Sequence, residues 1–219
     1  MKEIIRLCFV LTIIAAVSAG VLAYVNEKTA EPIAKALLEE KMSAVRSVLP
    51  PFDNEPDKDM ITISLEDGDS LDVYRGRKDG EVNGAAFAVT SPDGYSGDIE
   101  FMIGVDEGGV MQGLMVLNHL ETPGLGAKIE SEDFSGQYKG KSLENPELWE
   151  VTKDGGTFIP ITGATISSRA ITRAAATGLK LFQKHKAEIF AEGADTGNTE
   201  TEVDSAVVEE VEVEGEVQE

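Results

Sequence analysis

The chain has 219 residues, 42% of them hydrophobic and 27% charged, which is enough for one domain of ordinary size with appendages. Its 40 acidic and 19 basic residues leave a net charge of −21, which repels phosphate backbones and argues against a nucleic-acid partner. The single cysteine, Cys8, excludes intramolecular disulfides and cysteine-ligated iron–sulfur clusters. With only two histidines, the sequence predicts no metal site.

The N-terminus carries a hydrophobic segment typical of a membrane helix. Residues 7–25 contain no charge, and as a helix they would span roughly 28 Å, close to the ~30 Å hydrocarbon core of a bilayer. The alternative is a signal peptide cleaved at the small residues 17–19. Because the apolar run continues past that site, we predict a transmembrane anchor over 7–25, preceded by residues 1–6. Basic residues flank the span almost equally on both sides, so charge alone does not orient it.

Residues 26–50 are predicted to form a helical stalk. Apolar residues recur at helical spacing from Thr29 to Val48, and the pair Pro50-Pro51 would end the helix. Pro32 lies within this segment and is expected to kink it. We therefore expect the stalk to continue the membrane helix.

Residues 51–191 are predicted to form one domain around a mostly antiparallel sheet, with helices at its ends. Turn sequences rich in Gly, Asp and Asn separate short strand-like runs, and the sequence EGG between two of these runs indicates a hairpin. A helix with an apolar stripe follows at Ser168–Phe190. The predicted fold class is therefore α+β. The predicted strands are Ile61–Leu65, Leu71–Tyr74, Ala85–Thr90, Asp98–Val105 and Val110–Asn118.

The C-terminal segment, residues 192–219, has a different composition from the rest of the chain. It holds eleven acidic residues and no Lys or Arg, and it is repetitive in Val and Glu. Such a segment buries too little apolar surface to fold by itself. We predict an acidic, disordered tail outside the domain.

The first candidate site is a TGAT motif just before the last helix, formed by Thr162, Gly163, Ala164 and Thr165. Small residues let a ligand approach the backbone, and a helix N-terminus offers unpaired N–H groups to an anion. Residues 155–186 hold five bases and no acid, which suits a phosphate. The alternative is a helix start capped by Thr165 or Ser167 beside a solvated basic face.

The second candidate site is a tight loop after the last predicted strand, with the sequence HLETPGLG. Loops at strand ends commonly carry sites, and Pro123-Gly124 fits a type II turn. His119 and Glu121 are candidates for an acid–base pair, but no nucleophile motif accompanies them. The alternative is a structural turn in which His119 bonds locally. The loop residues predicted to contact a flat ligand are Glu121, Thr122, Gly124, Leu125 and Gly126.

These pieces occur together in a known order. An N-terminal anchor runs into VNEKTAEPIAKA, then GYSGDIEFMIGVDEGGVMQGLMVLNHLETPGLGAKI, then ITGATISSRAI at the start of a helix. Over about residues 5–190 the chain resembles the G subunit of the Rnf electron transport complex, a family with an FMN-binding domain. It is also similar to the C-type subunit of the sodium-pumping NADH:quinone reductase.

The resemblance implies a covalent cofactor. In that family a flavin transferase joins FMN through its phosphate to the last Thr of the [ST]GAT motif, which here is Thr165. Thr162, Ser167 and Ser168 are the alternative hydroxyls. The sequence that the transferase prefers usually has an acidic residue three positions before the motif, where this chain has Ile159. The loop at 121–126 is then expected to contact the isoalloxazine ring.

The implied role is electron relay in an ion-translocating ferredoxin:NAD oxidoreductase, with other membrane subunits as partners. The family places the soluble domain on the outer, periplasmic side of the cytoplasmic membrane, with residues 1–6 inside. Two alternatives remain open. One is a membrane-tethered reductase or sensor that binds FMN without a covalent link, or else a quinone-reductase C-type subunit. The other is a flavin-free anchor protein in which TGAT only caps a helix.

Overall fold

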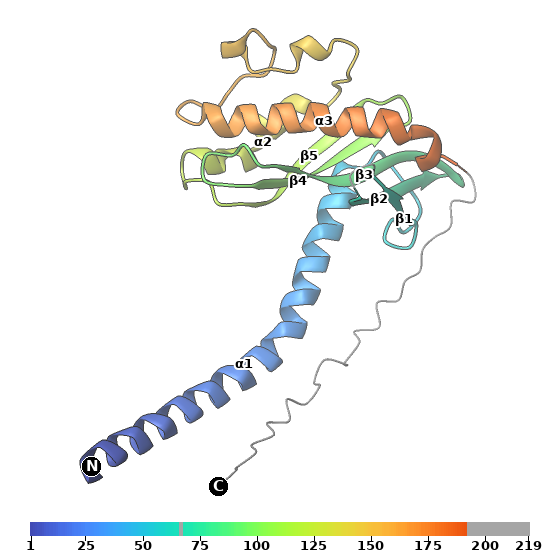
Figure 1. The fold of residues 1–219 in the computed structure, drawn as a ribbon. Coiled ribbons are helices and arrows are strands. Elements are labelled where there is room, and N and C mark those ends of the chain that lie inside the picture. The colour runs from blue at the N-terminus through green and yellow to red at the C-terminus, as the bar shows by residue number, and fades with distance from the viewer. Residues whose placement is uncertain (66–67, 192–219) are drawn as a thin grey trace.

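The computed structural model describes residues 1–65 and 68–191 (Figure 1). The chain begins with one unbroken helix, α1 (Lys2–Val48), which contains Pro32 and changes direction along its length in Figure 1. Proline removes one backbone N–H from the helix ladder, which accounts for such a bend. By length and composition α1 can cross a membrane, and no other helix in the described chain can. The predicted continuity of hydrophobic segment and stalk is confirmed.

Five antiparallel strands follow as a simple meander in the order β1-β2-β3-β4-β5. All five were predicted, and the EGG hairpin joins the last two. The second and third strands are longer than predicted, because Asp79 and Gly80 both adopt positive φ in the two-residue turn between them. The strands are β1 (Met60–Ser64), β2 (Ser70–Lys78), β3 (Glu81–Ser91), β4 (Ile99–Asp106) and β5 (Met111–His119).

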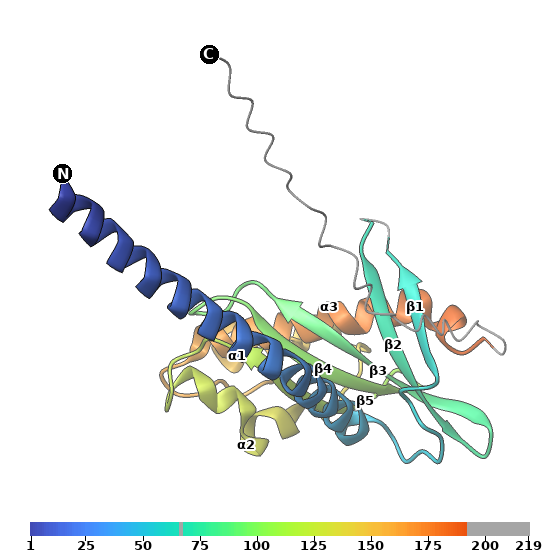
Figure 2. The same ribbon diagram turned by 90° about the horizontal axis from the view of Figure 1, so that it is seen from below.

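Two helices cover opposite faces of this sheet (Figures 1 and 2). The last helix, α3 (Thr165–Ile189), starts three residues earlier than predicted and packs on the face that carries Phe87 and Ile103. The end of α1 packs on the other face, against Ala86 and Met102. The structure is therefore α+β, as predicted. All members of the predicted stripe of α3 are buried: Ile171, Ala175, Gly178, Leu179 and Phe182.

Three glycines on adjacent strands form a seat for the end of α1. A Cβ atom on Gly104 would overlap the backbone carbonyl of Val48, and one on Gly84 would overlap the ring of Pro50. A Cβ on Gly113 would lie 3.1 Å from the Cα of Val48. The absence of side chains here lets helix backbone rest directly on the sheet, which fixes where the stalk leaves the domain.

The loop after α1 is tied to the sheet by a buried polar cluster. Asp59 pairs with both Arg75 and Arg77 on β2, and Arg75 is only 1% exposed. Asn54 donates to the carbonyl of Arg75 at 3.0 Å and accepts from the N–H of Arg77 at 2.8 Å. The cluster and the glycine seat together join the stalk firmly to the domain.

Besides the predicted turns at ETPGLG and TGAT, the connection from β5 to α3 contains five short helical turns, none of which was predicted. They pack around an aromatic cluster of Phe134, Tyr138, Trp149 and Phe158, with the rings of Tyr138 and Phe158 stacked at 4.6 Å. The Tyr138 hydroxyl bonds Thr172 of α3 at 2.7 Å, and burial raises the pKa of this phenol. The turns are η1 (Gly126–Glu130), α2 (Glu132–Ser135), η2 (Gly136–Tyr138), η3 (Pro146–Leu148) and η4 (Thr152–Asp154). The predicted acidic tail, 192–219, lies outside the described residues.

Candidate functional site

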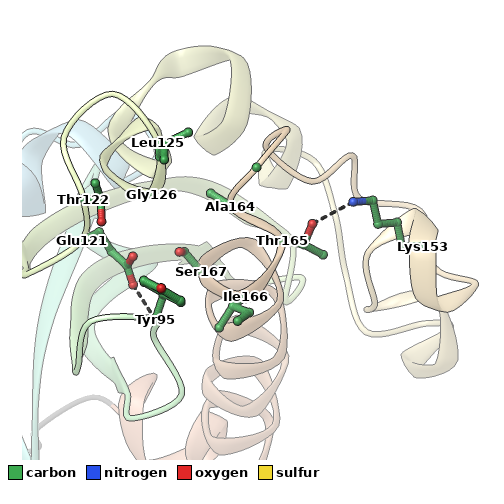
Figure 3. A pocket seen from close by; sticks show the side chains of 11 residues that line it. Tyr95, Glu121, Thr122, Leu125, Gly126, Lys153, Ala164, Thr165, Ile166 and Ser167 are labelled. Atoms are coloured by element: carbon green, nitrogen blue, oxygen red, sulfur yellow. Dashed lines mark hydrogen bonds between the residues drawn. The ribbon is translucent and has the colours of Figure 1, made fainter.

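A pocket of about 410 Å³ opens at the N-terminal end of α3, where three loops meet (Figure 3). One loop joins β3 to β4, one follows β5, and one carries the TGAT motif. The volume falls in the range of small-molecule and cofactor sites. The lining residues are Tyr95, Glu121, Thr122, Leu125, Gly126, Lys153, Gly163, Ala164, Thr165, Ile166 and Ser167.

The TGAT motif forms a tight turn that leads directly into α3. The Ala164 N–H donates to the Ile161 carbonyl at 3.0 Å, and Gly163 between them has φ of 84°. A positive φ of this size is adopted readily by glycine and only rarely by other residues. Ala164 is the N-cap and makes no side-chain cap bond. The first N–H groups of α3 are therefore left open at the pocket wall.

Three hydroxyls at the start of α3 have three different environments. The Thr165 hydroxyl accepts a hydrogen bond from Lys153 Nζ at 2.9 Å. Ser168 is buried, donates to the Ala164 carbonyl at 2.9 Å and accepts from the Ile161 N–H at 3.0 Å. Ser167 is 1% exposed, and its Oγ has no hydrogen-bond partner among the residues that the structure describes. Neither Thr165 nor Ser167 caps the helix, so the structure contradicts the capping alternative.

Figure 3 shows the Ser167 hydroxyl pointing into the pocket, toward the side of Glu121. A buried hydroxyl without a partner costs free energy unless something bonds it. The pocket is the space from which such a partner can come. This residue therefore marks a place where a polar atom of a ligand fits.

Two bases on the first turns of α3 are paired with acidic residues, whereas Lys180 and Lys186 farther along the helix are exposed to solvent, as the capping alternative expected. Arg169 donates to Asp154 from two nitrogens, at 2.6 and 3.0 Å, and Arg173 donates from Nε to both carboxylate oxygens of Glu150, at 2.8 and 3.0 Å. The hydrogen bonds from Arg169 lower the pKa of Asp154, and the same pair raises the pKa of Arg169. We call these two pairs the arginine clamp, because they hold residues 150–154 against the first turns of α3.

The pKa shift of Asp154 predicts how the clamp responds to acid. A carboxyl whose pKa is lower in the folded than in the unfolded protein adds stability above its unfolded pKa of about 4 and loses it as the pH falls through the folded pKa. The stability difference between the wild type and Asp154→Asn should therefore be constant from pH 8 to about 5 and shrink below pH 4. Denaturation at several pH values measures it, and a difference that grows on acidification would contradict the assignment.

The loop after β5 contains the predicted type II turn. The Leu125 N–H donates to the Thr122 carbonyl at 3.1 Å, and Gly124 has φ of 77°. His119 bonds locally, since its Nδ1 accepts from the Glu121 N–H at 3.0 Å and its Nε2 contacts Glu130 at 2.9 Å. The side chains of His119 and Glu121 do not pair with each other, so no acid–base pair forms there.

Glu121 instead joins two of the loops around the pocket. Its carboxylate is buried and accepts hydrogen bonds from the backbone N–H groups of Tyr95, at 2.7 Å, and Ser96, at 3.4 Å. A Cβ atom on Gly126 would overlap this carboxylate, so the glycine allows the close approach. Glu121 thus shapes the pocket and holds Tyr95 at its edge.

Glu121→Gln should weaken this junction. Both backbone donors bond the same carboxylate oxygen, so an amide can still accept from them but loses the negative charge that strengthens both bonds, and we expect a loss of about 1 kcal/mol in the free energy of unfolding. Chemical denaturation checks the value. Glu147→Gln, which removes an exposed carboxylate on η3, is the matched control and should change stability by less than about 0.5 kcal/mol. Equal stability of the two variants would contradict a structural role for Glu121.

The pocket gathers seven of the nine residues that the sequence proposed and leaves out two. Thr162 lines a neighbouring hollow with Lys128 and Ile159, and Gly124 lies at the tip of its turn. Three lining residues were missed in the sequence analysis: Tyr95, Lys153 and Ile166. The position of Tyr95 could have been predicted, because in a meander the loop from β3 to β4 lies at the same end of the sheet as the end of β5. For Lys153 we find no signal.

Comparison with known proteins agrees with this geometry. The FMN-binding domain family matches residues 94–180, a segment that includes both loops and the TGAT motif. The G subunit of the ion-translocating oxidoreductase complex of Cereibacter sphaeroides is 39% identical over 181 residues, covering 80% of this chain and 82% of that protein. The protein of the same name from Pseudomonas aeruginosa is 34% identical over 200 residues, covering 87% and 94%.

The chain is also similar to a solved structure, the C subunit of the Na⁺-translocating NADH-quinone reductase of Parabacteroides distasonis. The two chains are 25% identical with a TM-score of 0.43, and the match covers 53% of this chain and 63% of the other. The identities to the two oxidoreductase-complex proteins extend over most of both chains. They confirm the resemblance that the motifs indicated. The chain belongs to the family of G subunits of ion-translocating oxidoreductase complexes, and it carries that family's FMN-binding domain.

Proposed function

We propose that this chain is the covalent flavoprotein subunit of a membrane-bound electron transport complex, with FMN joined through its phosphate to Thr165 Oγ1. One observation carries the proposal. The Thr165 hydroxyl lies at the open N-terminus of α3, is not used as a cap, and already accepts a bond from the Lys153 ammonium. A helix start and a nearby cation are what a phosphate needs.

The remaining pocket residues also fit FMN. The space beside Thr165 is of cofactor size, and the unpartnered Ser167 hydroxyl offers a hydrogen bond inside it. The loop that carries Glu121 and Leu125 forms its other wall. FMN supplies the redox chemistry, whereas the protein supplies its position and the surroundings that set its potential. Ser168 is fully engaged in the turn, which favours Thr165 over it as the attachment site.

The wider role follows from the family. We infer that electrons pass between reduced ferredoxin and NAD through the complex, coupled to ion translocation, and that this protein relays them as one part of the translocase. The partners are the other membrane subunits, the bilayer around α1, and a flavin transferase for maturation. We infer that the domain lies on the periplasmic side of the cytoplasmic membrane. A covalent tether suits that location, because the cofactor cannot diffuse away.

The test is the mass of the protein purified from cells that hold the flavin transferase. We expect one FMN less one water above the sequence mass, with the addition on the peptide that spans Phe158–Arg169 and on Thr165 within it. The yellow colour should survive denaturation. An unmodified peptide would overturn the covalent assignment. If colour were present and left on denaturation, the protein would instead bind FMN noncovalently, for which the Ser167 hydroxyl is the supporting observation.

A further inference from the structure

We propose that Lys153 prepares Thr165 for flavin attachment and afterwards holds the attached phosphate. The inference rests on the proposed covalent link at Thr165. It concerns a residue that lies twelve positions earlier in the chain, on η4, and that no part of the TGAT motif indicates.

Lys153 is held in place by its neighbours on both sides. The arginine clamp fixes Glu150 and Asp154 to the first turns of α3, and the Thr152 N–H donates to the Phe158 carbonyl at 2.8 Å. Lys153 therefore sits on a segment that is anchored to the same helix that Thr165 begins. Its Nζ lies 2.9 Å from the Thr165 Oγ1, and a dashed line marks this hydrogen bond in Figure 3. The contact results from an anchored backbone, and not from a long side chain alone.

The charges of this cluster match the product of attachment. The clamp contains two arginines and two carboxylates, and Lys153 adds one positive charge, so these five side chains carry a net charge of about +1. Once FMN is joined to a threonine, its phosphate is a diester with a single negative charge. The open N–H groups at the start of α3 and the unpartnered Ser167 hydroxyl add donors on the pocket side. Lys153 supplies the charge that the clamp itself lacks.

The attachment step has a developing charge that Lys153 can stabilise. Flavin adenine dinucleotide carries FMN in a phosphoanhydride. The bond from Thr165 Oγ1 to phosphorus forms as the anhydride bond breaks, AMP leaves, and the hydroxyl proton passes to the transferase. Negative charge grows on the phosphoryl oxygens during this exchange, next to the ammonium. The Lys153 ammonium donates a hydrogen bond to the reacting oxygen and so orients the hydroxyl. Its positive charge also stabilises the transition state, in which negative charge has grown on the phosphoryl oxygens.

The test compares rates of attachment in otherwise identical chains. Protein made without the transferase is incubated with purified transferase and flavin adenine dinucleotide, and covalent FMN is followed by intact mass. We expect Lys153→Met to lower the initial rate about tenfold or more, as loss of a charge-assisted hydrogen bond would. Lys153→Arg should stay within about threefold of the wild type. Lys180→Met, which removes an exposed lysine farther along α3, is the matched control and should leave the rate unchanged.

The outcomes separate this inference from the proposed function. A modified wild type with equal rates for Lys153→Met and Lys180→Met would overturn the role of Lys153 and leave Thr165 in place. An unmodified wild type would overturn both. Thermal unfolding of the apo forms checks the fold, and we expect no difference because the Lys153 side chain is exposed. If Lys153→Arg were as slow as Lys153→Met, a hydrogen-bonding cation would not be the cause, and the proposal would fail.

Discussion

Replacing Thr165 with Ala should remove all covalently bound FMN and leave the fold intact. The hydroxyl is the proposed attachment atom, so no ester can form without it. Its loss costs little stability, because Thr165 makes no capping bond and its side-chain partner among the described residues is an exposed lysine. We expect a change in the free energy of unfolding below about 0.5 kcal/mol. In-gel fluorescence of the denatured protein measures the bound flavin, and chemical denaturation measures the stability.

Two further variants make this result specific. Thr165→Ser keeps a hydroxyl at the same place and should remain modified. Ser167→Ala removes the neighbouring hydroxyl that points into the pocket, and it should keep the covalent flavin, because Ser167 is proposed as a contact and not as the attachment site. Fluorescence that persisted in Thr165→Ala and vanished in Ser167→Ala would move the link to Ser167. Loss in neither variant would point to Thr162, which faces the adjacent hollow.

The TGAT turn and the ETPGLG turn could be predicted because each is local. Gly163 and Gly124 adopt the positive φ that their sequences indicated, and both turns form over a few consecutive residues. The five strands were predictable for the same reason, since turn residues separate them. The pairing of neighbouring strands then brings the loop of Glu121 to the correct sheet edge without long-range information.

The pairing of charges around α3 could not be predicted from the sequence. Residues 155–186 do contain five basic and no acidic residues, as the sequence analysis noted. It could not reveal that Glu150 and Asp154 fold back onto Arg169 and Arg173. That contact depends on the irregular turns between β5 and α3, which have no hydrophobic period and are organised by the aromatic cluster. The cation at the site is therefore Lys153, which lies outside the stretch that looked basic.

Gly104→Ala should detach the stalk from the domain, with the largest loss of stability among these variants. A Cβ atom there would overlap the backbone carbonyl of Val48, which cannot move aside as a flexible side chain can. We expect a loss of about 3 kcal/mol in the free energy of unfolding, because either β4 or the last turn of α1 must shift. The end of α1 would lose its contacts with Met102 and Ala86. Cleavage by a protease near Leu49 should become faster.

Gly136→Ala is the matched control for this variant. Gly136 has helical φ of −65°, and the nearest atom to a Cβ there would be 4.0 Å away, so stability should change by less than about 0.5 kcal/mol. Equal stability of the two variants would contradict the glycine seat.

Covalent FMN should remain in Gly104→Ala, because the pocket lies at the start of α3, on the opposite side of the sheet from the stalk. The variant therefore separates two requirements of electron relay. Thr165→Ala removes the cofactor from a domain that is still correctly placed, whereas Gly104→Ala leaves the cofactor on a domain that is loosely joined to its membrane helix. If the second variant loses electron transfer while it keeps its flavin, the direction in which α1 leaves the sheet determines where the cofactor meets its redox partners.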